Sequence, residues 1–322
     1  MTTKILVTGC LGFIGSHFVK YTLKNTNWGI IGFNRNSDQR NYRRWDDITN
    51  QDMRRIQLIY GDLSNNSNVS GILEDVDYCV NFAAKTFVDH SIRDTRPFVE
   101  SNILGTVNLL EEAVRNKKTL QRYIQVSTDE VYGAILKGSY KEDSRLNPTN
   151  PYAAAKASAD MLTLSYFNTH GVPAIITRTE NNFGEYQHPQ KALPKFVKYA
   201  MENKPLPIYG DGEHVRMWLY VEEHCSAILH LLSKGEVGEV YHGAGEQELT
   251  NNQLANIVLT TLGKDPSCVM HLDDHNARPG HDRRYALNTE KIRATGWKPK
   301  YKLQDKLQDV VRWYAKNDWW SK

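Results

Sequence analysis

The stretch ILVTGCLGFIG, residues 5–15, decides the fold that we expect for this chain. It places Gly9, Gly12 and Gly15 directly after the first apolar run, in a GxxGxxG spacing at the start of a helical pattern. Glycines at such a turn let the backbone approach a pyrophosphate, and the free amides and dipole of the following helix meet its charge. The motif therefore predicts a dinucleotide site on the first strand of an α/β domain.

Short β-rich runs alternate with helical patterns through the first half of the chain. The runs are KILVT (4–8), WGIIGF (28–33), IQLIY (56–60), YCVNFA (78–83), RYIQV (122–126) and PAIITR (173–178). Such alternation predicts a doubly wound parallel sheet of the Rossmann type with helices on both faces. We assign residues 1–178 to this dinucleotide-binding domain, with a returning segment at about 214–240.

The remaining segments have a different texture, with more turn residues and proline. Residues 179–213 and 241–322 are expected to form a smaller C-terminal α/β domain that binds the substrate. Thr250 and Gly263 have the residue types that begin and end a helix, so we expect one at 251–262 and another at 303–317.

The charge balance favours a small-molecule partner. Forty Lys and Arg against 37 Asp and Glu leave a formal charge of only +3, which gives no reason to expect nucleic acid or a membrane surface. The four cysteines are scattered without a CxxC pair, so we expect neither disulfides nor a metal site. No apolar run approaches the roughly 18 residues of a membrane helix, and no secretory signal is recognisable. These features predict a cytoplasmic location.

Two further loops fit a dinucleotide that lies across the strand ends. GDL (61–63) follows the third run, where Asp62 can accept a hydrogen bond from the adenine amino group, and NFAA (81–84) follows the fourth. After the second run, where an acidic residue usually binds the ribose hydroxyls, the chain has Asn34 and Arg35. Because arginine can pair with a 2′-phosphate, NAD and NADP both stay open. The expected cofactor-binding residues are Gly9, Gly12, Phe13, Ile14, Gly15, Asn34, Arg35, Asp62, Leu63, Ala83, Ala84, Ser127, Tyr152 and Lys156.

A tyrosine and a lysine stand four residues apart in NPYAAAKASADML, residues 150–162. Asn150 can cap the helix and Pro151 suits its first position, so Tyr152 and Lys156 should share one face. A neighbouring ammonium group stabilises a phenolate and lowers its pKa, which lets tyrosine take a proton from an alcohol near neutral pH. This pair predicts an oxidoreductase step at a hydroxyl group.

Six motifs together are specific: TGCLGFIGSH (8–17), STDEVYG (127–133), PYAAAKASAD (151–160), RTENNFGEYQHPQKALPKF (178–196), PIYGDGEHVRMWLYVEEH (207–224) and RPGHDRRYA (278–286). Through them nearly the whole chain resembles the extended short-chain dehydrogenase/reductase superfamily. Within it the sequence is similar to the nucleotide-sugar 4,6-dehydratases, especially those acting on dTDP-glucose. The resemblance implies a tightly bound, recycled cofactor and a homodimer through helices at about 97–115 and 151–170.

The adjacent carboxylates of STDEVYG are explained by that resemblance. A strand would point residues 129 and 130 to opposite faces, so the strand should end near Ser127 and a turn should aim the next side chains into the ligand crevice. By resemblance, Tyr152 takes the C4 hydroxyl proton, Glu130 abstracts the C5 proton and protonated Asp129 donates to the departing C6 hydroxyl. Crowding of two carboxyl groups helps to keep one protonated. The expected catalytic residues are Thr128, Asp129, Glu130, Tyr152 and Lys156.

The substrate end follows the family less closely. The chain has Lys85, Glu185, Met217 and His242 where dTDP-glucose dehydratases usually have glutamate, proline, aspartate and asparagine. A UDP, GDP or CDP hexose, or an N-acetylated one, therefore stays open. The resemblance implies a substrate site of Lys85, Thr128, Asn182, Lys191, Leu193, Pro194, Arg216 and Arg278.

Two alternatives are carried forward from the sequence. A nucleotide-sugar epimerase or decarboxylase on the same scaffold would need no complete Thr-Asp-Glu set. A non-catalytic protein that senses a dinucleotide could keep the fold without the chemistry. The intact catalytic residues argue against both.

Overall fold

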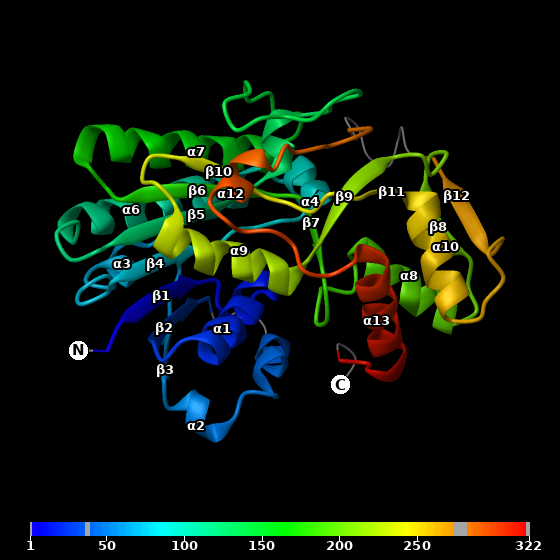
Figure 1. Ribbon diagram of the computed structural model, residues 1–322, viewed down its shortest axis with the longest axis horizontal. Coiled ribbons are helices and arrows are strands. Elements are labelled where there is room, and N and C mark those ends of the chain that lie inside the picture. The colour runs from blue at the N-terminus through cyan, green and yellow to red at the C-terminus, as the bar shows by residue number, and fades with distance from the viewer. Residues whose placement is uncertain (1, 36–38, 274–281, 320–322) are drawn as a thin grey trace.

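The computed structural model describes residues 2–35, 39–273 and 282–319. Its largest layer is a seven-stranded sheet in the order β10-β6-β5-β4-β1-β2-β3, in which every neighbouring pair is parallel (Figure 1). The doubly wound Rossmann-type prediction is therefore confirmed. The strands are β1 (Lys4–Thr8), β2 (Gly29–Asn34), β3 (Ile56–Tyr60), β4 (Tyr78–Asn81), β5 (Arg122–Thr128), β6 (Ala174–Thr179) and β10 (Val240–Gly243).

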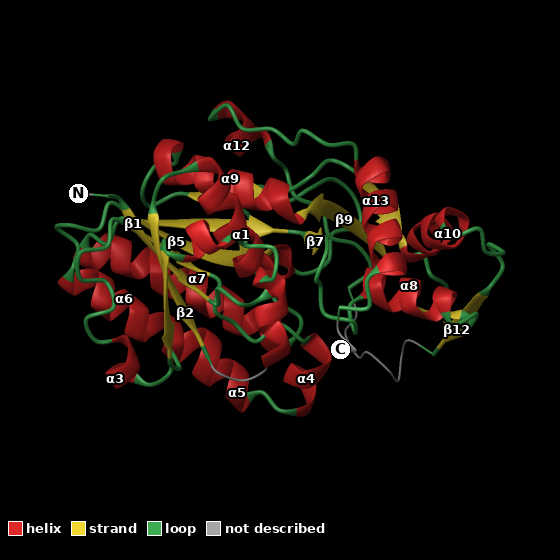
Figure 2. Cartoon of the chain, turned by 90° about the horizontal axis from the view of Figure 1, so that it is seen from below, coloured by secondary structure: helices red, strands yellow, loops and turns green. Residues whose placement is uncertain are grey.

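Helices cover both faces of this sheet (Figure 2). On one face α1 (Phe13–Asn25) packs against α9 (Val221–Lys234), and on the other α6 (Gly105–Arg115) packs against α7 (Pro151–His170). Each face has its own buried apolar cluster, one around Phe18 and Ile228, the other around Leu109 and Tyr123. Strands buried on both sides read as continuous apolar runs, which is why the sequence revealed them.

Short helical segments connect these layers. They are η1 (Gln39–Trp45), α2 (Asn50–Met53), α3 (Asn66–Val69), α4 (Val88–Arg93), α5 (Arg96–Phe98), the π-helical η2 (Val99–Leu104), the 3₁₀ turn η3 (Asp129–Tyr132) and α12 (Glu290–Ala294).

A smaller part of the molecule lies beyond the carboxyl ends of the strands. It contains a three-stranded sheet of β7 (Asn181–Phe183), β9 (Val215–Tyr220) and β11 (Glu248–Thr250), and a pair formed by β8 (Leu206–Tyr209) and β12 (Val269–Leu272). Its helices are α8 (Ala192–Met201), α10 (Asn251–Thr261) and α13 (Leu303–Lys316). Thr250 and Gln253 form a capping box on α10, and Gly263 follows with φ of 65°, as the sequence predicted.

The chain passes between the two parts more than once. After β9 in the small sheet, α9 returns to pack on α1, and β10 then adds a seventh strand beside β6. The returning segment thus runs on to Gly243. Helix α12, later in the chain, also packs against β10.

The described residues show no helix with both the length and the apolar character that a membrane crossing needs. Across the same part of the chain, His, Cys, Asp and Glu side chains form no group of three or more suited to a metal ion. All four cysteines are free thiols, and Cys10, Cys79 and Cys225 are buried.

Candidate active site

The glycine loop leaves the N-terminus of α1 open to an anion. Gly9 has φ of 63°, and a Cβ atom there would lie 3.0 Å from the Ala83 backbone nitrogen. A Cβ atom on Gly15 would lie 2.3 Å from the Gly9 carbonyl oxygen. Gly12 begins the helix without a side-chain cap, and the first turn holds no acidic residue. Tight backbone packing and uncapped amides suit a pyrophosphate, so the residues fit a dinucleotide.

Polar residues at the ends of β2 and β3 border the same loop. The Leu11 amide donates to Asn34 Oδ1 at 3.3 Å, and Arg35 Nη1 lies 3.5 Å from Asp62 Oδ2. Burial opposes ionisation of Asp62, but hydrogen bonds from Ser64 and the Arg35 charge hold its pKa below the ordinary value. Arg35 is therefore paired with a carboxylate at the expected ribose end.

The fourth and fifth strand ends complete the predicted cofactor side. The Ala83 amide donates to Thr8 Oγ1 at 3.2 Å, which fixes the loop that faces Gly9. Ser127 Oγ is buried and, among the described residues, has no hydrogen-bond partner. Leu63 packs in the apolar cluster below, so its side chain serves the core.

The two adjacent carboxyl groups lie on a turn, as expected. Strand β5 ends at Thr128, and η3 begins with Asp129. The Thr128 hydroxyl donates to Asp129 Oδ1 at 3.1 Å and accepts the Glu130 amide at 3.4 Å. Asn150 Nδ2 donates to Glu130 Oε2 at 3.3 Å. The turn thus joins the end of β5 to the start of α7.

Their environment separates the two acids. Burial, followed by the Glu130 charge, raises the pKa of Asp129 to about 7. Burial also raises the pKa of Glu130, but Lys191, Asn150 and Arg216 oppose that rise. Asp129 is therefore protonated in much of the neutral range, which suits a general acid.

Tyr152 and Lys156 stand on the first turns of α7, with Asn150 as the cap that accepts the Ala153 amide at 2.9 Å. The expected fall in the pKa of Tyr152 is not found, because burial and the charges of Glu130 and Asp129 raise it. Lys156 donates to the Val126 carbonyl oxygen at 2.5 Å, and burial lowers its pKa to about 8. The protein alone therefore favours a neutral phenol.

Two basic side chains approach the carboxyl groups from the smaller part. Lys191 donates to the Thr86 carbonyl oxygen at 3.3 Å and lies 4.7 Å from the Phe87 ring centroid. Arg216 lies 4.6 Å above the Tyr285 ring and donates to the Asp282 carbonyl oxygen at 2.9 Å. The charges of both side chains lower the pKa of Glu130.

The other residues that were expected to bind the substrate lie in different environments. Asn182 Oδ1 is buried without a partner in the described part of the chain. The Leu193 and Pro194 side chains are buried on the first turn of α8, and Leu193 belongs to the main core. The Lys85 amide donates to Asn102 Oδ1 at 2.8 Å. Arg278 lies outside the described residues.

Two departures from the family pattern have structural partners. His242 is fully buried on β10, where Nδ1 donates to the Asn288 carbonyl oxygen and Nε2 accepts from the Tyr132 hydroxyl, both at 2.8 Å. Burial lowers its pKa to about 3. Met217 Sδ accepts the Leu287 amide at 3.3 Å. His242 is thus fully buried, with both ring nitrogens bonded within the protein.

Two acids near the site, Asp282 and Glu180, were not among the residues predicted from the sequence. Asp282 Oδ2 accepts from Thr149 at 2.6 Å and from Tyr285 at 2.5 Å, and its charge raises the pKa of Glu130. Glu180 is buried and directly follows β6. The rule that ligand-facing residues follow parallel strands, which found Asp129, could have found Glu180 as well.

A glycine-rich first loop, a doubly wound sheet and a Tyr-x-x-x-Lys helix beside a serine-bearing strand end define the chain as an extended short-chain dehydrogenase/reductase. The family model of GDP-mannose 4,6 dehydratase matches residues 6–310. The chain belongs to the NAD-dependent nucleotide-sugar 4,6-dehydratase family of hydro-lyases.

Full-length relatives agree with this assignment. The chain is 42% identical to dTDP-glucose 4,6-dehydratase of Streptomyces niveus, covering 99% of this chain and 95% of the relative. It is 40% identical to the low-salt glycan biosynthesis protein Agl12 of Haloferax volcanii, covering 98% and 99%.

Among solved structures, DesIV of Streptomyces venezuelae, a dTDP-glucose 4,6-dehydratase with NAD and TYD bound, superimposes with a TM-score of 0.92 at 40% identity, covering 99% of both chains. The UDP-glucuronic acid 4-epimerase of Bacillus cereus, in complex with UDP-glucuronic acid and NAD, has a TM-score of 0.89 at 28% identity and covers 98% and 99%. Epimerases therefore share the scaffold.

Proposed function

We propose that this protein removes water from a nucleoside-diphosphate hexose to give the 4-keto-6-deoxy sugar, with dTDP-glucose as the first candidate substrate. One observation carries the proposal: Asp129 and Glu130 meet Tyr152 at the carboxyl end of β5, close enough that their charges raise the pKa of Tyr152. An epimerase that moves a hydride at one carbon has no need of an acid and a base beside the tyrosine.

The proposed cofactor is NAD, held by the glycine loop, Asn34, Asp62, Ala83 and Ser127. When bound, the cofactor would supply hydride transfer from C4 to C6 and a positive ring that would oppose the rise in the pKa of Tyr152. Support for NAD over NADP comes from Arg35, because Asp62 already pairs with it and a carboxylate repels a 2′-phosphate. Three dTDP-glucose 4,6-dehydratase structures at about 40% identity also contain NAD.

Three side chains move the protons of the proposed reaction. Tyr152 takes the C4 hydroxyl proton, and the resulting 4-ketone acidifies the C5 proton. Glu130 removes that proton, and Asp129 donates its own to the C6 hydroxyl, which leaves as water. Glu130 then returns a proton to C5 as hydride reaches C6. Thr128 hydrogen-bonds near the C4 oxygen, and Lys156 supports Tyr152 electrostatically.

The nucleotide is the less constrained part of the proposal. Asn182, Lys191 and Arg216 would bind the diphosphate end, together with the uncapped N-terminus of α8. dTDP-glucose is favoured because several full-length relatives carry that activity in their names. UDP-glucose is the second candidate, since the Arabidopsis thaliana trifunctional protein that includes UDP-glucose 4,6-dehydratase is 37% identical over 98% of this chain.

We also propose that the protein forms a homodimer through residues 97–115 and 151–170. Apolar side chains stand exposed on these segments: Val99 is 44%, Leu104 43% and Met161 64% exposed. A four-helix bundle would cover them. Sedimentation at micromolar concentration should give twice the monomer mass, and a purely monomeric boundary would contradict the dimer.

The purified protein should be incubated without added cofactor with dTDP-glucose, UDP-glucose, UDP-N-acetylglucosamine, CDP-glucose, GDP-mannose and GDP-N-acetylglucosamine. Mass spectrometry should show the loss of one water from one of them, because the cofactor is recycled within each turnover. No dehydration of any sugar by protein that retains a dinucleotide would reject the proposed function. An isomerised sugar of unchanged mass would favour the epimerase.

A further inference from the structure

Glu180 is a buried acid beside the catalytic turn that has no part in the proposed reaction. It directly follows β6, as Asp129 directly follows β5, and these parallel strands pair with Thr128 opposite Thr179. Carboxyl ends of neighbouring parallel strands meet at one edge of the sheet. The register therefore brings the two acids to adjacent positions.

The contacts of Glu180 leave one of its oxygens unused. The side chain is 4% exposed, and Oε1 accepts the Gly245 amide at 2.6 Å. Its Oε2, like Asp129 Oδ2, is buried and has no hydrogen-bond partner among the described residues. A buried polar atom without a partner costs stability, so two in neighbouring acids call for an explanation.

Three acids lie near enough to Glu180 for their charges to act on it. Burial raises its pKa well above the ordinary value, and the charges of Asp129 on η3, Glu248 on β11 and Glu223 on α9 raise it further. A carboxyl group in this setting keeps its proton to higher pH than an exposed one, so it is a better proton donor to a neighbouring acid. The same geometry disfavours a simple ion-pairing role for Glu180.

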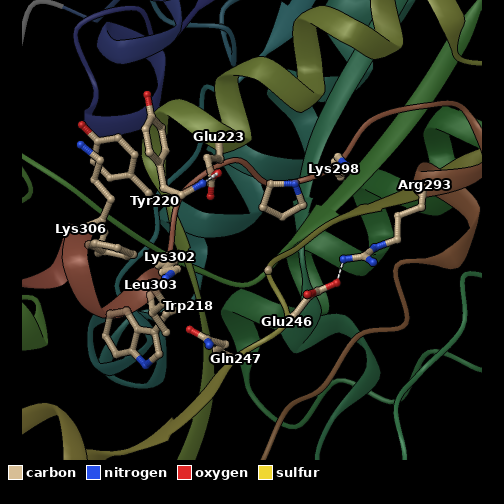
Figure 3. A pocket seen from close by; sticks show the side chains of 14 residues that line it. Trp218, Tyr220, Glu223, Glu246, Gln247, Arg293, Lys298, Lys302, Leu303 and Lys306 are labelled. Carbon is tan, nitrogen blue, oxygen red and sulfur yellow. Dashed lines mark hydrogen bonds and ion pairs between the residues drawn. The ribbon is translucent and has the colours of Figure 1, made fainter.

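A cavity of about 290 Å³ is lined by Gly245, the residue whose amide donates to Glu180. Trp218, Glu223, Glu246 and Gln247 line it, as Figure 3 shows, and Arg293 pairs with Glu246 at its wall. Because Gly245 both lines the cavity and donates to Glu180, this acid lies next to a polar space large enough for water.

After the proposed reaction Tyr152 holds one proton more than at the start, and Asp129 holds one proton fewer. In each turnover Tyr152 gains the C4 hydroxyl proton, Glu130 takes and returns one proton, and Asp129 loses one to the departing water. Before the next turnover Asp129 must therefore gain a proton and Tyr152 must lose one. Asp129 is 5% exposed, so direct exchange with bulk solvent is restricted.

We propose that Glu180 returns a proton to Asp129 after each turnover and is itself reprotonated from water in the cavity that Gly245 lines. The O–H bond of Glu180 breaks, one forms on Asp129, and no oxidant or reductant is needed. This inference rests on the proposed dehydration. It makes Glu180 a positioning residue that acts through Asp129 without touching the sugar.

The test compares the first turnover with the steady state in Glu180→Gln, whose amide oxygen can still accept the Gly245 amide. Protein equilibrated at pH 6 is mixed either with less than one equivalent of nucleotide sugar or with a saturating amount. We expect the first turnover to stay within about twofold of wild type while kcat falls at least about tenfold, a loss typical of a missing proton carrier. Glu180→Asp, which keeps a carboxyl group, should recover most of kcat.

Glu112→Gln is the matched control. Glu112 lies on α6 and, like Glu180, is buried and accepts a glycine amide, that of Gly71 at 3.0 Å. It should leave the ratio of the two rates at the wild-type value.

If Glu180→Gln slows both phases equally or changes neither, the proton-return role is rejected while dehydration stands. If Glu180→Gln does not fold, Glu180→Asp decides by the same ratio, and a slowed first turnover there rejects the role. No dehydration by the wild-type protein rejects the proposed function itself.

Discussion

Asn150 ties Glu130 to the start of α7, because one side chain serves both. Its Oδ1 accepts the Ala153 amide at 2.9 Å, and its Nδ2 donates to Glu130 Oε2 at 3.3 Å. The residue that begins the tyrosine helix thus also holds the proposed base. Helix geometry and base orientation are therefore coupled.

Asn150→Ala should lower both stability and activity. Loss of the cap should cost about 1 kcal/mol of unfolding free energy, and loss of the amide donor should raise the pKa of Glu130 and shift the acid limb of the rate profile to higher pH. Thermal unfolding and the pH dependence of kcat/KM measure the two effects. Thr250→Ala removes the cap of α10 and should lower Tm alone. An unshifted pH profile in Asn150→Ala would contradict the coupling.

Separate roles for the two acids predict separate losses. Glu130→Gln should slow exchange of the C5 proton with solvent, and Asp129→Asn should slow release of water more than oxidation at C4. Each loss should be about 10²- to 10⁴-fold. Deuterium incorporation at C5 and single-turnover absorbance of the reduced cofactor report the two steps. Full activity in both variants would show that the roles are wrong.

Asp129 should also make stability depend on pH. Its pKa is about 7 in the folded protein and near 3.8 when unfolded, so the folded state binds more protons between these values. The unfolding free energy should therefore fall as pH rises from about 4 to about 7. Asp129→Asn should flatten this slope in denaturant titrations, although Glu180 adds a slope of the same sign. An unchanged slope would show that Asp129 titrates normally.

The Arg35 to Asp62 pair predicts the cofactor preference. Asp62→Asn removes a carboxylate and leaves Arg35 to meet a 2′-phosphate, so the affinity for NADP relative to NAD should rise about tenfold, which corresponds to about 1.4 kcal/mol. Calorimetry on protein stripped of nucleotide measures both affinities. Asp52→Asn, which breaks the Asp52 to Arg55 pair at 3.2 Å, is the control and should not alter the preference.

Local patterns predicted most of the fold. Apolar runs marked the first six strands, and Asn150, Thr250 and Gly263 marked helix boundaries because their side chains or backbone angles act locally. The seventh strand, β10, was not among the predicted runs. Four residues that pair with β6 across a long sequence separation carry little local signal.

The candidate site was predicted less completely than the fold. Motifs predicted roles for residues 128–130, Tyr152 and Lys156, and the structure places residues 128–130 at the end of β5 and the other two on the first turns of α7. The pKa of Tyr152 could not be predicted, because burial and two carboxyl groups outweigh the lysine. Glu180 directly follows β6, so the strand-end rule could have found it, whereas Asp282 lies on a separate segment whose effect on Glu130 arises from tertiary packing.

The strand β10 has a consequence for attempts to exchange substrate preference between relatives. Because β10 lies between β9 and β11 in the chain yet completes the large sheet, no single cut separates the two parts. In a chimaera joined at one crossover near residue 180, α9 and β10 would come from the relative. They would then have to pack against α1 and pair with β6 of the host. Exchange therefore needs at least two inserts, one on each side of residues 221–243, with those residues kept from the host.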